Sequence, residues 1–119
     1  MKIPLEASLL RIFIGESDKS HGRPLYEVIV EEARKRGLAG STVLRGIHGF
    51  GANSRIHTSK VLRLSDDLPI VIEIVDAEEK IENFLPDLDK MIGEGLITLE
   101  KVRVIAYRHS SPNSKPSEK

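Results

Sequence analysis

The chain has 119 residues, which suits a single domain, and it contains no cysteine. Disulfides, thiolate catalysis and cysteine-based zinc sites are therefore excluded. No apolar run reaches the length of a membrane span and no leader pattern follows Met1, so we expect a cytoplasmic protein.

Charge is balanced overall but not along the chain, since 18 basic and 18 acidic residues give a net charge of zero. Residues 33–65 carry seven Lys or Arg and no Asp or Glu, whereas residues 66–100 carry eleven acidic residues and two lysines. Two interpretations stay open: the halves face one another and cancel, or the basic half binds an anion. We expect no nucleic-acid partner, because the net charge is zero and the basic stretch holds one aromatic ring.

The first half of the chain predicts a strand, a helix and a second strand. Residues 8–15 form the strand, with apolar side chains on both of its faces. After a polar turn, Pro24 opens a helix, and Gly37 ends it as a left-handed cap. Residues 41–47 are rich in β-branched side chains and form the second strand.

The second half predicts a strand, a helix and a last strand. Residues 68–75 form the strand, and Asp76 and Glu79 then make a capping-box pattern for a helix. We expect Pro86 to kink or interrupt that helix. Residues 96–107 form the last strand. We expect a domain of residues 1–108 followed by a disordered tail, residues 109–119.

This order of elements predicts an α+β fold of the ferredoxin-like βαββαβ type. In that fold an antiparallel four-stranded sheet carries two helices on one face. The other face also needs a cover, because Leu9, Phe13, Val71 and Val75 make it apolar. Self-association is the simplest cover.

About twenty residues, 48–67, separate the second and third strands. A loop of that length in a compact domain favours a functional segment. Its first part is rich in glycine and other small residues, with Arg55 and His57 among them. Small residues let a backbone approach a ligand closely, and arginine forms strong hydrogen bonds to anions. The loop therefore favours binding of an anion.

Three runs in and before this loop carry a resemblance: GLAGSTV at residues 37–43, GFG at 49–51 and HT at 57–58. They are similar to the base of the signalling loop in the nitrogen-regulatory PII proteins. Residues 8–108 resemble an uncharacterised PII-like family of bacteria and archaea more closely. That second resemblance is carried by GES at residues 15–17, HGRPLY at 21–26 and EEKI at 78–81.

The resemblance implies a homotrimeric regulatory protein rather than an enzyme. Small anionic metabolites or nucleotides would bind at clefts between subunits, and the loop would report occupancy to a partner such as a membrane transporter or an enzyme. No other cofactor is assigned. The candidate ligand-binding residues are Thr42, Arg45, Gly49, Phe50, Gly51, Arg55, His57, Arg103 and Arg108.

Two cations that hold phosphate in the PII proteins have no counterpart here, because Leu96 and Ala106 occupy their positions. Each charge-assisted contact contributes roughly 1.5–3 kcal/mol. We therefore expect weak ATP binding unless Arg45, Arg55 or Arg103 substitutes. The loop tyrosine that PII proteins modify is also absent, so uridylylation is not expected.

Three alternatives use other residues. His21-Gly22-Arg23 precedes a helix N-terminus and suits either an anion site or an ordinary polar turn. His48 and His57 favour structural or ligand-contacting roles over a divalent-metal site in a trimer of the same fold, because their spacing matches no ligand motif. An acylphosphatase-like hydrolase would need Arg23 in a phosphate cradle and Asn53 to orient water.

Overall fold

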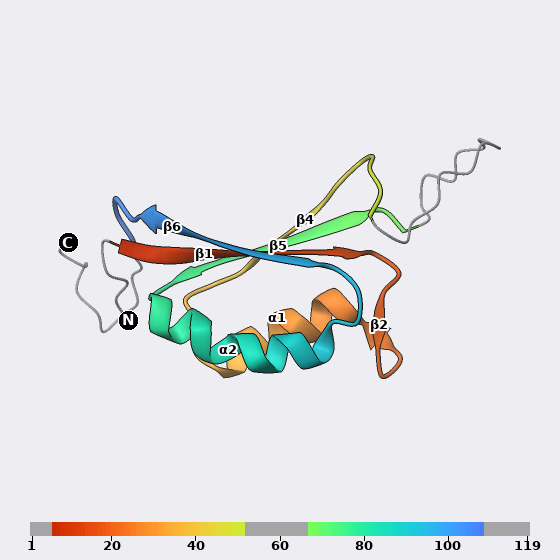
Figure 1. The fold of residues 1–119 in the computed structure, drawn as a ribbon, viewed down its shortest axis with the longest axis horizontal. Coiled ribbons are helices and arrows are strands. Elements are labelled where there is room, and N and C mark those ends of the chain that lie inside the picture. Colours follow the sequence, from red (N-terminus) through yellow and green to blue (C-terminus); the bar gives the residue numbers. More distant parts are fainter. Residues whose placement is uncertain (1–5, 52–66, 109–119) are drawn as a thin grey trace.

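The computed structural model describes residues 6–51 and 67–108. They form a four-stranded sheet of order β4-β5-β1-β6, with both helices on one side of it (Figure 1). Every pairing in that sheet is antiparallel, so the predicted ferredoxin-like fold is confirmed. The elements are β1 (Glu6–Gly15), β2 (Lys19–Ser20), β3 (Arg23–Pro24), α1 (Leu25–Lys35), β4 (Thr42–Arg45), β5 (Pro69–Asp76), α2 (Glu78–Met91) and β6 (Leu96–Arg103).

The first strand of the chain lies in the interior of the sheet. In β1, Ile12 is opposite Ile72 of β5 on one side and Ile97 of β6 on the other. Directly paired residues of antiparallel strands share a face of the sheet. Alternate residues of β1, β5 and β6 therefore build two distinct faces, and β4 and β6 are the two edges.

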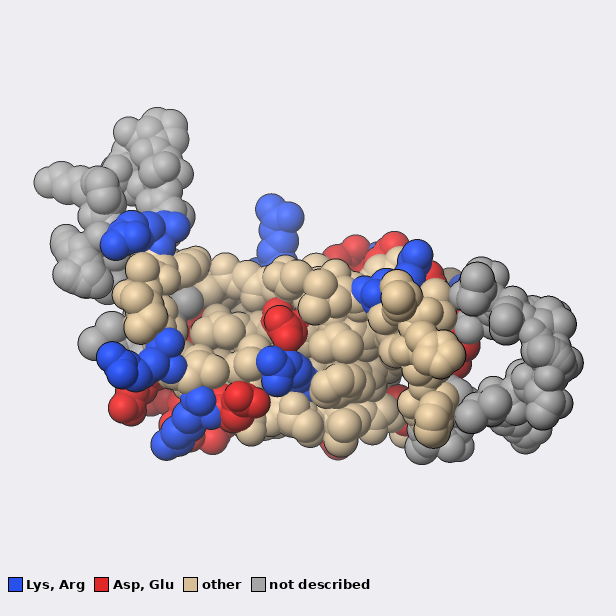
Figure 2. Space-filling model, turned by 90° about the horizontal axis from the view of Figure 1, so that it is seen from above, with Lys and Arg blue, Asp and Glu red and all other residues tan. Residues whose placement is uncertain are grey.

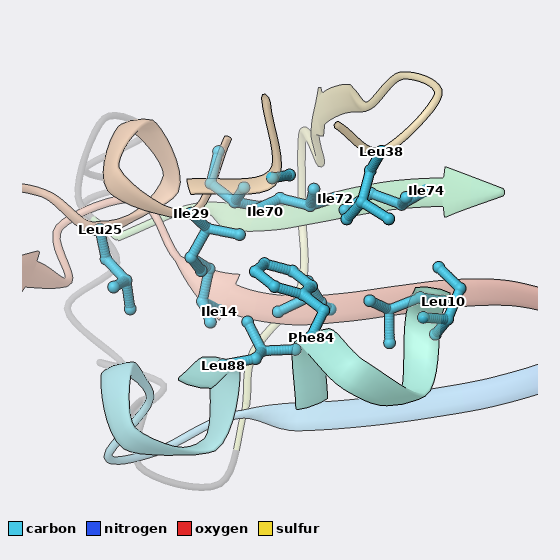
Figure 3. Packing of buried hydrophobic residues seen from close by; sticks show 13 residues of the cluster. Leu10, Ile14, Leu25, Ile29, Leu38, Ile70, Ile72, Ile74, Phe84 and Leu88 are labelled. Carbon is cyan, nitrogen blue, oxygen red and sulfur yellow. The ribbon is translucent and has the colours of Figure 1, made fainter. Parts of the chain in front are cut away.

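The helix-side face holds the core. Phe84 and Leu88 of α2 and Ile29 of α1 are fully buried, and they pack onto the sheet together with Leu25 (Figure 3). Each such side chain contributes roughly 1.5–3 kcal/mol on burial. The strand residues of this cluster are Leu10, Ile12, Ile14, Ile70, Ile72 and Ile74.

Pro86 does not interrupt α2, and the predicted capping of this helix by Asp76 is wrong. The helix continues from Glu78 to Met91 through Pro86. Pro86 is exposed while Ile81, Phe84 and Leu88 are buried, so packing of the opposite stripe offsets the hydrogen bond that proline removes.

Asp76 does not cap that helix through its side chain, because the N-cap residue is Ala77 and no side-chain cap bond forms. Asp76 is the last residue of β5 and is fully buried. Its carboxylate accepts hydrogen bonds from the backbone N–H groups of Ala77, at 2.7 Å, and Ala39, at 2.9 Å. It thereby joins the start of α2 to the segment after α1.

The face opposite the helices, which we call the open face, is apolar, and no element of residues 6–51 or 67–108 covers it. Leu9 and Phe13 of β1 and Val71 and Val75 of β5 are half-buried on it. Figure 2 looks onto this face and shows few charged side chains on its central part. Charged open-face residues are Arg11, Glu73 and Glu100, with Arg11 Nε 2.8 Å from Glu73 and Nη1 3.4 Å from Glu100.

Neither helix of the described residues has the length and apolarity needed to cross a membrane.

Candidate functional site

The long loop leaves the sheet at the end of β4 and returns at the start of β5. The Gly46 N–H donates to the Pro69 carbonyl at 2.7 Å and holds the two ends together. A Cβ on Gly46 or Gly49 would lie 3.2 or 3.1 Å from Cγ of Pro69. Glycine at both positions therefore lets the chain pass close to the proline ring. We call residues 45–49 and 67–69 the loop base.

Arg45 provides a cation at the loop base. Its Nη2 lies 2.7 Å from Oε2 of Glu16, which belongs to the turn after β1. The side chain of Arg45 is 59% exposed and that of Glu16 is 24% exposed. Among the described residues, the guanidinium thus has one carboxylate partner, and it still faces solvent.

The same turn, residues 15–18, also holds the returning end of the loop. The Glu16 N–H donates to the Leu68 carbonyl at 2.8 Å. Asp67 Oδ1 accepts from the N–H of Ser17 at 3.3 Å and from its hydroxyl at 2.8 Å. A Cβ on Gly15 would lie 2.2 Å from that oxygen, so the contact requires glycine at this position. Both ends of the loop therefore meet at one turn.

The remaining candidates on this side of the sheet are spread out. Thr42 is paired with Glu73 and lies on the open face, whereas Arg45 is paired with Ile70 and lies on the other face. Phe50 is exposed, and no described residue other than its chain neighbours lies within 4 Å of the place that a Cβ on Gly51 would take. The structure brings Arg45 and Gly49 to the loop base but does not join them to Thr42.

Arg103 lies at the other edge of the sheet, and Arg108 follows a segment that turns back toward the start of β4. Arg103 ends β6, and β6 and β4 form opposite edges. The Tyr107 hydroxyl donates to the Ala39 carbonyl at 3.3 Å, which brings the segment after β6 to the segment before β4. Within one chain, then, Arg103 and Arg45 do not share a site.

Two candidate residues of the loop, Arg55 and His57, lie outside the described residues, as do Asn53 and the tail of residues 109–119.

The structure favours the polar-turn interpretation of His21-Gly22-Arg23. His21 and Gly22 have φ values of +50° and +82° and form the turn between β2 and β3. Arg23 donates to both oxygens of Glu31, at 2.9 and 2.6 Å, and lies 3.6 Å from Glu27. The hydrogen bond with Glu31 raises the pKa of Arg23 and lowers the pKa of Glu31. Arg23 is thus already paired with carboxylates of α1.

Metal-ligating side chains do not gather in the part of the chain that is described, where no group of three or more His, Asp or Glu is placed to hold an ion. The two halves of opposite charge meet where Arg36 forms an ion pair with Asp87 of α2. Arg36 also pairs with Glu32 of α1 at 3.3 Å.

Sequence reasoning missed the turn of residues 15–18 as part of the loop base. Glu16 and Ser17 lie far from Arg45 and Asp67 in sequence, and Ser17 is 50 residues from Asp67. The signal in the sequence is the GES run of residues 15–17 at the end of a strand, which carries part of the resemblance to the uncharacterised PII-like family.

Comparison with known proteins places the chain in a family. Residues 7–104 match the model of DUF190, which is described as "Uncharacterized ACR". The chain belongs to the DUF190 family. A UPF0166 protein of Aquifex aeolicus (strain VF5) is 46% identical over 101 residues, 85% of this chain and 95% of that protein. A UPF0166 protein of Methanocaldococcus jannaschii is 37% identical over 101 residues, 84% of this chain and 93% of that protein.

Solved structures of PII-like proteins share the fold of this DUF190 chain. A putative PII-like signaling protein from Thermus thermophilus has a TM-score of 0.61 at 20% identity, over 87% of this chain and 94% of that one. CPII, a nitrogen regulatory PII-like protein from Thiomonas intermedia bound to ADP, AMP and bicarbonate, has a TM-score of 0.54 at 17% identity. That match covers 86% of this chain and 96% of CPII. The predicted resemblance to an uncharacterised PII-like family is thereby confirmed.

Proposed function

We propose that this DUF190 chain is a PII-like regulatory protein that binds a small anionic effector, with adenine nucleotides as the first candidates. The observation that carries the proposal is Arg45, an exposed cation held at the loop base beside the carboxylate of Glu16. A solvent-facing guanidinium can form paired hydrogen bonds with a phosphate group. The PII-like neighbour CPII, which is bound to ADP and AMP, supports the choice of ligand.

The effector site lies between subunits of a homotrimer. Arg45 ends β4 on one edge of the sheet and Arg103 ends β6 on the other, so a second copy is needed to bring these two cations together. The apolar open face supports self-association, since an uncovered face of that kind is costly in water. The loop of residues 48–67 reports occupancy to a partner, a membrane transporter or an enzyme.

Titration calorimetry with ADP, AMP, ATP and inorganic phosphate tests the proposal. We expect ADP to bind, and Arg45→Gln to weaken it about tenfold through loss of one charge-assisted contact. Arg23→Gln is the matched control, because Arg23 is held by carboxylates of α1 away from the loop base. The proposal fails if none of the four ligands binds, or if the two variants weaken ADP equally.

A further inference from the structure

The cation that the proposed effector needs already has an anionic partner in this structure. Glu16 Oε2 lies 2.7 Å from Arg45 Nη2, and a carboxylate oxygen accepts the same kind of hydrogen bond as a phosphate oxygen. An arriving phosphate must therefore share this guanidinium with Glu16 or take the place of its carboxylate. Either way, the energy of the existing pair and the repulsion between the two anions oppose binding.

The backbone of Glu16 is held in place by its neighbours. Its N–H bonds the Leu68 carbonyl at 2.8 Å, and the N–H of Leu25, at the start of α1, bonds the Asp18 carbonyl at 2.8 Å. Asp18 Oδ2 also accepts from the Gly15 N–H at 3.0 Å. The carboxylate of Glu16 consequently stays near Arg45, at a high effective concentration, whether or not a ligand is present.

We propose that Glu16 is an internal competitor for the anion at Arg45. This inference rests on the proposed function, since it concerns the same site. Glu16 neutralises Arg45 in the empty protein, and the effector displaces the Glu16 carboxylate from the guanidinium when it binds. Glu16 thus sets the affinity of the site without contacting the effector favourably.

Competition of this kind also selects the class of effector. A ligand with a single carboxylate offers Arg45 no more charge than Glu16 does, and it competes against a tethered group whose effective concentration is in about the millimolar range. A phosphate ester carries roughly two negative charges at neutral pH. The site therefore favours phosphate-bearing ligands over simple carboxylates, and Glu16 supplies that preference.

The test is titration calorimetry of ADP and acetate with the full-length wild type, Glu16→Gln, Arg45→Gln and the double variant. We expect Glu16→Gln to bind ADP about fivefold more tightly, as removal of one ion pair and one repulsion implies. It should also narrow the preference for ADP over acetate. In the Arg45→Gln background the same substitution should have a clearly smaller effect, because only the repulsion between Glu16 and the phosphate is then left to relieve.

Two further variants separate this effect from general changes in charge or stability. Glu31→Gln removes a carboxylate on α1 that lies as close to Arg23 as Glu16 lies to Arg45. This substitution should leave ADP affinity unchanged. Glu16→Asp keeps the charge but withdraws it from the guanidinium by one methylene. If Glu16→Gln lowers the melting temperature, Glu16→Asp decides the question: tighter ADP binding than wild type supports competition, and unchanged or weaker binding overturns it.

The inference and the proposed function fail in different ways. If wild type binds ADP but Glu16→Gln binds it equally or more weakly, Glu16 is not a competitor and only the inference falls. The same holds if Glu16→Gln acts equally with and without Arg45. If neither wild type nor any variant binds ADP, the proposed function fails and the inference falls with it.

Discussion

The two faces of the sheet are built from the same strands and differ in what covers them. On the helix side, β1 and β5 present isoleucine and leucine that are almost fully buried beneath α1 and α2. On the open face, the alternate residues of those strands are apolar too but only half-buried, with Arg11 and its glutamates among them. The chain completes one face with its own helices, and we infer that other copies complete the second.

The largest expected effect is on the helix side. Phe84→Ala should lower the free energy of unfolding by about 3–5 kcal/mol, because it leaves a cavity in a fully packed core. Urea unfolding followed by circular dichroism measures the loss. Phe50→Ala is the control, since Phe50 is 69% exposed while Phe84 is 0% exposed, and it should change stability by less than about 0.5 kcal/mol. Equal losses would contradict the assigned core.

An intermediate effect is expected on the open face, and there it concerns assembly rather than folding. Val71→Lys should lower the association constant of the proposed trimer about tenfold or more, because it would place an unpaired charge in an apolar interface. Light scattering after gel filtration measures the mass. Asn83→Lys, on the exposed side of α2, makes the same substitution away from that face and should leave assembly intact. A monomeric wild type at micromolar concentration would overturn the role given to this face.

The smallest effect is expected on the outer side of α1, which faces solvent and needs no other subunit to cover it. Arg23 lowers the pKa of Glu31 in the folded protein, so the pair stabilises the fold above the ordinary carboxyl pKa. That stability is lost as pH falls through the lowered pKa. Glu31→Gln should therefore melt slightly below wild type at neutral pH, and the difference should shrink as pH falls through the lowered pKa of Glu31. Melting curves that diverge on acidification would contradict this sign.

Much of the fold could be predicted because its signals are local. The period-2 pattern of residues 8–15 and the apolar stripe of the second helix each report the packing of one element. The errors came where packing overrides local preference. Pro86 stays within α2 because buried residues hold the helix on both sides of it. Asp76 is buried at the end of β5 and accepts a hydrogen bond from the Ala39 N–H instead of capping the helix.

The site could be predicted only in part, because its geometry depends on the order of strands. The sequence predicts that Arg45 and Gly49 lie close together, because they are close to each other in the chain. It could not show that Arg103 lies at the opposite edge from Arg45, which follows from the order β4-β5-β1-β6. It also could not show that Glu16 meets Arg45, a contact that exists only after β1 and β4 flank β5.

The interior position of β1 has a consequence for how the chain folds as it is made. Synthesis produces β1 first, yet its two neighbours are β5, which ends at Asp76, and β6, which ends at Arg103. Until those strands emerge, a strand that is apolar on both faces has no hydrogen-bonded neighbour. Contacts between distant parts of a chain form slowly, and unpaired strands associate with one another. Nascent chains released before Arg103 should therefore aggregate, and refolding should be limited by the closing of β6 onto β1.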